Sequence, residues 1–393
     1  MSKNIVICSD GTGNAFAKKV SNVMRLIKSL ALDRPEQQIV LYDQGIGTHS
    51  NLVRSVEAYA AKDNSRCALR FFREPRKLPL LPALIPCVLG LAFGYGLRDN
   101  VRQMYQFLSK EWGTGDQVFL IGFSRGAFTV RALAGLVYRC GLARSEVAGG
   151  DAFEQCFERA WALYAPHEPV CAAIEDYKQK FGVPNACRIR FLGLWDTVKS
   201  YGGIWPRSLP HLRHNPIVLK VRHALALNEK RSWFIPTSWG GIDGDDLEQL
   251  GVEDDPRYGC QDVQEVWFRG CHSDVGGGDK ELNSAVISLR WMLREAKASG
   301  LMLSPDGEKI LQEDDPSYLT EIHESLTCGW LFSEYIPRWE LDNSQRPPRR
   351  LFKIGRSGVR HVDQFSRKGK INVHQSARQD YHLRTVEFIH SIP

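Results

Sequence analysis

The strongest chemical signal in the sequence is the run Gly122-Phe123-Ser124-Arg125-Gly126. It follows an apolar stretch and opens a stretch of helical spacing, which is the strand–turn–helix context of a nucleophile elbow. So tight a turn strains the serine backbone, and Gly122 and Gly126 leave room for the neighbouring strand and helix because they lack a Cβ. We therefore predict that Ser124 is a nucleophile. The alternative is a serine that only caps a helix.

A serine hydroxyl is a weak nucleophile and needs a base that is itself oriented by an acid. We expect His272, in a glycine-rich loop after an apolar run, to be the base, and Asp196, at the end of another apolar run, to be the acid. Both would lie at the carboxyl edge of a parallel sheet, where α/β active sites form. Two alternatives stay open, Asp274 as the acid and His223 as the base.

An oxyanion formed at the attacked carbonyl needs amide donors. The N–H of Arg125 is expected to be one, because it lies at a helix start where amides have no intrahelical partner. The second is expected from Gly11 or Thr12, in the turn Asp10-Gly11-Thr12-Gly13 after the first predicted strand. Asp10 is either part of this machinery or a turn former.

The elements that must position these residues follow from the hydrophobic pattern. Short apolar runs predict strands at 4–9, 38–42, 117–123, 188–194 and 265–268, and helical spacing predicts helices at 19–32, 101–112 and 125–138. Strands that alternate with helices predict an α/β-hydrolase fold, with a mostly parallel sheet covered on both faces. We expect a catalytic domain over 1–300, with an apolar insertion at about 52–97, and a peripheral C-terminal extension over 301–393 packed on it.

The apolar insertion contains twenty consecutive residues without a charge, Leu78–Leu97. That length suits a membrane span, but Pro79, Pro82 and Pro86 oppose a spanning helix. The segment is therefore interpreted as buried core, as a lid, or as an anchor that lies on lipid. Under the last interpretation, the residues expected to contact the membrane are Leu80, Leu81, Leu84 and Ile85.

Composition bears on the class of partner, the redox state of the cysteines and the location of the protein in the cell. The chain has 393 residues and a formal net charge of +6, and its basic residues are scattered, so nothing indicates a nucleic-acid partner. Ten cysteines without a CxxC pair or zinc-ligand spacing indicate reduced thiols and no zinc site, and the predicted chemistry of Ser124, His272 and Asp196 needs no metal or organic cofactor. The N-terminal residues have no secretory h-region, which predicts a cytoplasmic location in the producing cell and leaves open export without a cleaved signal peptide.

Five motifs occur together in order: Ser9–Thr12, Tyr42–Thr48, Gly122–Ala127, Leu194–Val198 and His272–Gly278. Together they resemble the catalytic domain of the first class of type VI secretion lipase effectors, a family with many uncharacterised bacterial and fungal α/β hydrolases. The resemblance covers about Asn4–Trp291 and implies an α/β-hydrolase fold with a Ser-Asp-His triad. The sequence departs from the expected pattern at Gln44, where a small residue would follow the acid.

The resemblance implies a serine carboxylester hydrolase that acts on lipids, a phospholipase of the A type. Its expected partners are a lipid or ester substrate and a membrane surface, with no nucleic acid. A soluble-ester or thioester hydrolase is the alternative within the same chemistry. A non-catalytic, hydrolase-like binding protein and a metal-dependent hydrolase using Asp10, His272 and Asp274 are the alternatives of other classes.

Overall fold

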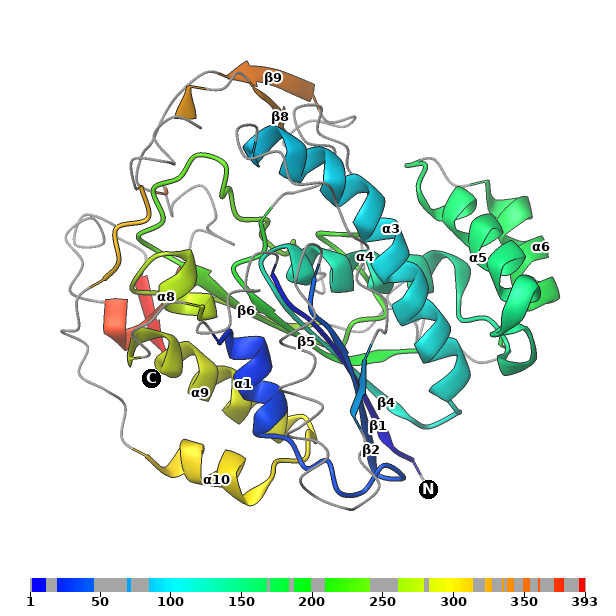
Figure 1. Ribbon diagram of the computed structural model, residues 1–393, viewed down its shortest axis with the longest axis horizontal. Helices are drawn as coiled ribbons and strands as arrows, with labels where there is room; N and C mark the ends of the chain where they lie inside the picture. Colours follow the sequence, from blue (N-terminus) through cyan, green and yellow to red (C-terminus); the bar gives the residue numbers. More distant parts are fainter. Residues whose placement is uncertain are drawn as a thin grey trace.

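The protein is built on one large parallel sheet. The computed structural model describes residues 2–11, 20–45, 69–71, 85–167, 170–183, 187–198, 209–240, 261–278, 283–313, 322–326, 334–335, 338–342, 349–353, 360, 371–377 and 389–392. In this part of the chain nine strands form a sheet in the order β11-β10-β7-β6-β5-β4-β1-β2-β3, and all neighbouring strands are parallel (Figure 1). The predicted α/β fold with a mostly parallel sheet is confirmed.

The five predicted strands are all present, with ends that differ by at most a few residues. The sheet strands are β1 (Asn4–Ser9), β2 (Gln38–Asp43), β3 (Leu69–Phe71), β4 (Gln117–Phe123), β5 (Ile189–Trp195), β6 (Lys220–Ala226), β7 (Asp262–Phe268), β10 (Ile371–His374) and β11 (Ile389–Ile392). A separate antiparallel pair consists of β8 (Arg338–Asp342) and β9 (Arg349–Lys353). The strands that the sequence pattern did not reveal are β3, β6 and those beyond residue 301.

Helices cover both faces of the sheet, as Figure 1 shows. They are α1 (Asn22–Lys28), α3 (Ile85–Glu111), α4 (Arg125–Cys140), α5 (Gly150–Tyr164), α6 (Cys171–Phe181), α8 (His272–Gly276), α9 (Asn283–Ala298) and α10 (Pro305–Gln312). Among the residues that the structure describes, 3-10 turns lie at Ser145–Val147 and Gln375–Ala377.

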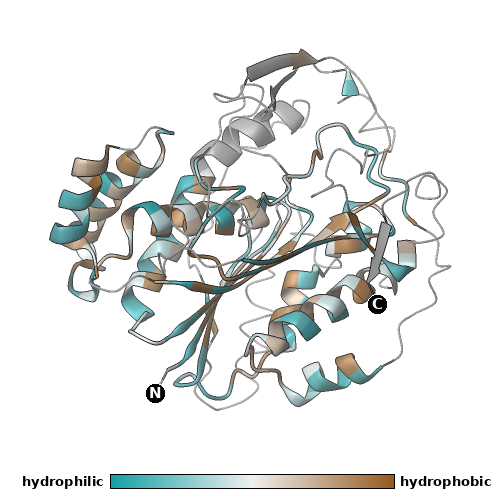
Figure 2. Ribbon diagram, turned by 180° about the vertical axis from the view of Figure 1, so that it is seen from behind, coloured by the Kyte–Doolittle hydropathy of each residue, from teal (hydrophilic) through white to brown (hydrophobic). Residues whose placement is uncertain are grey.

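The side chains of β1 show why both faces must be covered. Ile5 and Ile7 point into one core, with α3, α4 and α5, whereas Val6 and Cys8 point into the other, with α1 and α9. Because successive side chains of a strand alternate between faces, a strand that is apolar at every position needs helices on both sides. Figure 2 shows the same arrangement, with hydrophobic residues along the central strands.

Helix α3 includes the predicted helix at 101–112 and extends it towards the N-terminus by more than a dozen residues. Pro86 is the second residue of α3, where a proline removes no intrahelical hydrogen bond and is therefore compatible with the start of the helix. Leu97 is fully buried. No helix in the described part of the chain is long and apolar enough to cross a membrane. Leu80, Leu81 and Leu84 lie outside the described residues.

The chain beyond residue 301 contributes to the same sheet. β10 pairs with β7, and β11 pairs with β10. The fully buried Val373 of β10 packs with Trp267 of β7 and with Leu225 at the end of β6. The segment that was expected to be peripheral therefore extends the sheet on the side that carries β7.

Candidate active site

The turn between β4 and α4 has the geometry of a nucleophile elbow. Ser124 has φ 57° and ψ −119°, a region that residues with a side chain rarely occupy, and its N–H donates to the Trp195 carbonyl at 2.9 Å. A Cβ on Gly126 would lie 2.2 Å from the Ser9 carbonyl oxygen, and one on Gly122 would lie 2.6 Å from the backbone of α4. Both glycines are needed for this close approach, as the sequence predicted.

Asp196 and His272 meet at the carboxyl edge of the sheet. Asp196 directly follows β5 with φ 36°, and His272 is the first residue of α8, just after β7. The Asp196 Oδ2 lies 2.6 Å from the His272 Nδ1. Both side chains are buried, and Asp196 is completely so. An Nδ1–H that donates to Asp196 leaves the Nε2 of a neutral imidazole as the atom that can accept a proton.

The ring of His272 is held between two aromatic side chains. Phe123, the residue before Ser124, has its ring centroid 4.6 Å from the imidazole centroid, and Phe234 contacts the ring edge-on at 4.9 Å. Burial lowers the pKa of His272, and the hydrogen bond to Asp196 opposes this effect. The imidazole is therefore held in place beside the elbow and is biased towards its neutral form.

A buried arginine from far along the chain contacts the same carboxylate. Arg360 donates from its two terminal nitrogens to Oδ1 and Oδ2 of Asp196, at 2.6 Å and 3.0 Å. Burial alone would raise the pKa of Asp196, but the Arg360 charge and the hydrogen bond from His272 outweigh it and hold that pKa well below its usual range. The Arg360 charge and the His272 hydrogen bond therefore favour the ionised form of Asp196.

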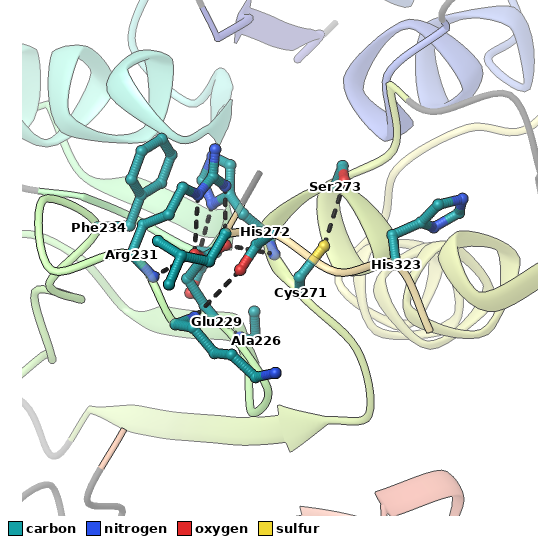
Figure 3. Close-up of polar contacts among 12 residues, drawn as sticks. Ala226, Glu229, Arg231, Phe234, Cys271, His272, Ser273 and His323 are labelled. Carbon is teal, nitrogen blue, oxygen red and sulfur yellow. Dashed lines mark hydrogen bonds and ion pairs between the residues drawn. The ribbon is translucent and has the colours of Figure 1, made fainter. Parts of the chain in front are cut away.

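The loop after β6 encloses His272 from another side. Figure 3 shows Glu229, Arg231 and Phe234 beside the histidine. Glu229 accepts the backbone N–H of His272 at 3.2 Å and pairs with Arg231 at 2.8 Å, and the Arg231 guanidinium stacks 3.6 Å from the Phe234 ring centroid. Burial raises the pKa of Glu229, but the Arg231 hydrogen bond and charge outweigh it and lower that pKa to about 2. This ion pair fixes the start of α8.

Asp274 is bonded to its own loop and to the C-terminal region. Its Oδ2 accepts the N–H of Cys271 at 2.9 Å, and its Oδ1 lies 2.5 Å from the His323 Nδ1. Among the described residues Asp274 makes no hydrogen bond to His272, in contrast to Asp196. The arrangement favours Asp196 over Asp274 as the residue that orients the imidazole.

His223, the other histidine considered as a base, lies inside β6 and is fully buried. Its Nδ1 lies 2.8 Å from Glu265 Oε1, and its Nε2 accepts the backbone N–H of Thr197 at 3.1 Å. Both ring nitrogens are thus occupied by protein groups. Burial lowers the pKa of His223 below its ordinary value, with Glu265 opposing. The geometry is that of a structural histidine.

The loop after β1 approaches the elbow from the neighbouring strand. A Cβ on Gly11 would lie 3.2 Å from the Ser124 Cβ, so this residue borders the serine directly. Its N–H donates to Asp10 Oδ1 at 2.7 Å, and Asp10 also accepts hydrogen bonds from Ser21 and Tyr42. Asp10 thus holds the loop in place, as a turn former would. Thr12 lies outside the described residues.

Arg125, the other expected oxyanion donor, is the first residue of α4. Amides in the first turn of a helix have no intrahelical acceptor, and the helix dipole is positive there. Burial lowers the pKa of the Arg125 side chain to about 10. The backbone N–H that the sequence singled out thus begins the helix directly after Ser124.

A second buried carboxylate supports the loop after β1. Asp43, at the end of β2, accepts hydrogen bonds at 2.8 Å from Ser9 and from Asn100 of α3. Burial raises the pKa of Asp43 to about 6, although these hydrogen bonds oppose the shift. Gly45 has φ 74°, and a Cβ there would lie 2.6 Å from the Asp10 carbonyl oxygen. The loops after β1 and β2 therefore pack directly on each other behind the elbow.

The described residues contain no cluster of side chains that could hold a metal ion. No group of three or more His, Cys, Asp or Glu side chains there has the arrangement of a metal site. Asp10 and Asp274 are each bonded to protein donors. Within this part of the chain, Asp10, His272 and Asp274 do not converge.

Two residues that contact the candidate site were not singled out by sequence reasoning. Glu229 follows the short apolar run Ala224–Leu227, whose strand character would have placed Glu229 at the same sheet edge as Asp196. Arg360 has no such signal, because it is a single arginine in a region without periodic pattern. Only the three-dimensional arrangement brings it to Asp196.

The parallel sheet, the strained serine between two glycines and the buried Asp–His pair are features of the α/β-hydrolase fold. The chain belongs to the family described as "T6SS, Phospholipase effector Tle1-like, catalytic domain", which matches residues 3–295. The resemblance noted in the sequence is thereby confirmed.

Individual relatives and solved structures match this chain over only part of their length. The chain is 31% identical over 242 residues to the uncharacterized protein YEL023C of Saccharomyces cerevisiae, which covers 59% of this chain and 32% of that protein. It is similar to an uncharacterized protein from Pseudomonas aeruginosa, with 20% identity, a TM-score of 0.41, and 79% and 48% of the two chains covered. It is also similar to the Tle1 effector bound to the VgrG spike from the type 6 secretion system, with 19% identity, a TM-score of 0.31, and 70% and 51% covered. The chain spans about a third of the yeast protein and about half of each solved chain.

Proposed function

We propose that the protein is a serine carboxylester hydrolase that acts on lipids, a phospholipase in which Ser124, His272 and Asp196 form the catalytic triad. The observation that carries the proposal is the 2.6 Å contact between His272 and Asp196 beside an elbow serine with positive φ. Membership of a phospholipase effector family supports a lipid as the substrate.

The proposed chemistry gives each of these groups a role. The Nε2 of His272 takes the Ser124 proton while the hydroxyl oxygen attacks the ester carbonyl, and Asp196 stabilises the imidazolium that forms. The backbone N–H of Arg125, together with that of Thr12, donates to the oxyanion, because the Gly11 N–H already donates to Asp10. His272 then returns the proton to the leaving alcohol, and a water molecule releases the acyl group from Ser124 by the same steps.

We further propose which bond of the lipid is cleaved, how the protein contacts the membrane and where it is made. Cleavage of an acyl ester in a phospholipid is A-type phospholipase chemistry, and it needs no metal or organic cofactor. A lipid aggregate as substrate implies a membrane contact, which we assign to Leu80, Leu81, Leu84 and Ile85. As a member of an effector family, the protein would be made in the cytoplasm and exported without a cleaved signal peptide.

The decisive experiment compares wild type with Ser124→Ala on phospholipid vesicles and on a soluble short-chain ester, with and without EDTA. Loss of the nucleophile should lower turnover by about 10⁴ to 10⁶ while the melting temperature stays close to wild type. A fluorophosphonate should label wild type at Ser124 and leave the variant unlabelled. Residual activity above a tenth of wild type, or labelling at another residue, would exclude Ser124 as the nucleophile.

The same assays separate the alternatives. Hydrolysis of the soluble ester but not of any vesicle lipid would indicate a soluble-ester or thioester hydrolase. Activity that EDTA removes and a divalent ion restores would indicate the metal-dependent class. No hydrolysis and no fluorophosphonate labelling would indicate a binding protein on a hydrolase scaffold.

A further inference from the structure

Arg360 occupies an unusual position for a residue outside the family match. It lies beyond residues 3–295, yet it is only 9% exposed and bonds to the candidate catalytic acid. Besides Asp196, its guanidinium donates to the carbonyl oxygens of Ala226, at 2.7 Å, and of Phe234. It therefore connects three parts of the site: the acid after β5, the end of β6, and the loop whose Phe234 contacts His272.

The hydrogen bonds at Asp196 explain what this connection does. A carboxylate has about four lone-pair sites. Oδ1 accepts from Ala226 N at 3.1 Å and from Arg360 at 2.6 Å, whereas Oδ2 accepts from Arg360 at 3.0 Å and contacts His272 at 2.6 Å. Four donors occupy all the lone-pair sites of the carboxylate and leave none for a proton. The planar guanidinium also fixes the orientation of the Asp196 carboxylate about its Cβ–Cγ bond.

On the basis of the function proposed above, we propose that Arg360 is a positioning residue of this site. It holds the Asp196 carboxylate in the orientation that aligns His272. As a permanent positive charge, it also sets the pH at which the Asp196–His272 pair takes up a proton.

The direction of the second effect follows from electrostatics. A hydrogen-bonded acid and base this close titrate as a pair with a shared apparent pKa. A positive charge beside the pair opposes the added proton, so its removal must raise that apparent pKa. A higher apparent pKa means that the base is lost at a higher pH, and the acid limb of the activity profile moves towards neutral pH.

The other charged groups around His272 belong to different elements and remain in every variant of Arg360. Glu229 and Arg231 form an ion pair in the loop after β6, and Asp274 of α8 pairs with His323. Arg125 lies at the start of α4. Because these groups do not change, a difference between the Arg360 variants reports the arginine itself.

The first experiment measures kcat/KM on a soluble ester between about pH 5 and pH 9 for wild type, Arg360→Gln and Arg360→Lys. Arg360→Gln removes the charge and should move the acid limb up by about 1 to 2 pH units. Arg360→Lys keeps the charge but loses the bidentate hydrogen bonds to Asp196. The acid limb of its pH profile should therefore stay near that of wild type, while kcat falls about tenfold.

Arg222→Gln is the matched control. Arg222 is a buried arginine of β6 whose guanidinium pairs with Asp262 at 2.8 Å and with Glu295 at 2.5 Å, at the opposite end of that strand. Its loss should lower the melting temperature without moving the acid limb. If Arg360→Gln behaves like this control, Arg360 is only a structural anchor and the proposal is wrong.

A second readout needs no substrate and separates this proposal from the proposed function. Histidine-labelled protein is titrated by NMR, with the His272 signal assigned from His272→Gln. The His272 apparent pKa should be below about 6.5 in wild type and higher in Arg360→Gln. A shifted pKa without ester hydrolysis would overturn the proposed function alone, whereas an equal pKa in both proteins would overturn the role of Arg360. If Arg360→Gln does not fold, a wild-type pKa above about 6.5 decides against that role.

Discussion

Two buried histidines, His223 inside β6 and His272 at the start of α8, differ in what their second ring nitrogen can do. In His223 both nitrogens are committed, one to Glu265 and one to the Thr197 N–H. In His272 the Nδ1 faces Asp196, and the ring lies against the residue before the elbow serine. At the scale of single residues, it is the hydrogen-bond partner that decides whether a histidine is a catalytic base.

Replacement of each histidine by alanine tests this distinction. His272→Ala should lower turnover on a soluble ester by about 10⁴ or more, as severely as Ser124→Ala, because triad members act as a unit. His223→Ala should lower the melting temperature, since it leaves Glu265 and an amide without their partner, but turnover per folded molecule should stay within tenfold of wild type. A severe loss of turnover in well-folded His223→Ala would move the base to His223.

The two candidate acids can be separated in the same way. Asp196→Asn keeps the size of the side chain but leaves Arg360 buried without its counter-charge, so both turnover and stability should fall. Turnover should fall by about 10³ to 10⁴, because the amide favours the wrong tautomer of His272. Asp274→Asn should affect the contact with His323 and change turnover much less. The reverse order of severity, measured on folded protein, would assign the acid role to Asp274.

At the scale of elements, the ends of β1 and β2 form the support behind the elbow. Asp10 and Asp43 are both buried and accept hydrogen bonds from Ser21, Tyr42, Ser9 and Asn100. The loop after β2 is packed against the Asp10 carbonyl through Gly45. Gly11 borders Ser124, so the loop after β1 connects this support to the nucleophile turn.

The raised pKa of Asp43 gives this support a pH dependence. Burial raises its pKa from about 4 in the unfolded chain to about 6 in the folded protein. The folded state therefore binds more protons between these values, and the contribution of this group to stability is present at low pH and lost as pH rises through 6. Between about pH 7 and pH 5 the wild type should gain about 1 kcal/mol relative to Asp43→Asn, measured by urea unfolding. A constant difference between the two proteins over this range would contradict the prediction.

The apolar insertion before α3 is the second element with a testable role. We expect that serines at Leu80, Leu81, Leu84 and Ile85 weaken vesicle binding and vesicle hydrolysis, because an apolar surface in the lipid interface is lost. Hydrolysis of a soluble ester and the melting temperature should stay near wild type. A variant that is unstable in both assays would show that the segment is core, and a stable variant with full vesicle activity would show that it does not contact lipid.

How much of this site was visible in the sequence depends on how local each signal is. The elbow, its two glycines and the ends of β5 and β7 could be predicted, because each consists of an apolar run followed by a polar residue. Strand β6 was missed because its Lys220, Arg222 and His223 interrupt the apolar pattern, although the structure buries the last two with ion-pair or hydrogen-bond partners. Arg360 could not be predicted, since its role depends on a contact 164 residues away in the chain.

At the scale of the whole molecule, the catalytic sheet and the C-terminal region are one structure. Residues beyond 301 provide β10, which covers the edge of β7, as well as Arg360 at Asp196 and His323 at Asp274. Glu334 accepts the N–H of Ser232, in the loop that flanks His272. The family match ends at residue 295, but the site is completed by chain that follows it.

The last prediction concerns a chain shortened to residues 1–300. The cut removes β10 and leaves the backbone edge of β7 and the side chains of Trp267 and Leu225 without their cover. Each large apolar side chain that becomes exposed costs about 1.5 to 3 kcal/mol, and the loss of Arg360 leaves Asp196 with two fewer donors. We expect little soluble protein, a lower melting temperature and no fluorophosphonate labelling of Ser124. The control is Tyr335→Ser in the full chain, because that side chain is 73% exposed and its loss should change none of these measurements. Stable residues 1–300 with turnover within tenfold of the full chain would show that the sheet and the site are complete without the C-terminal region.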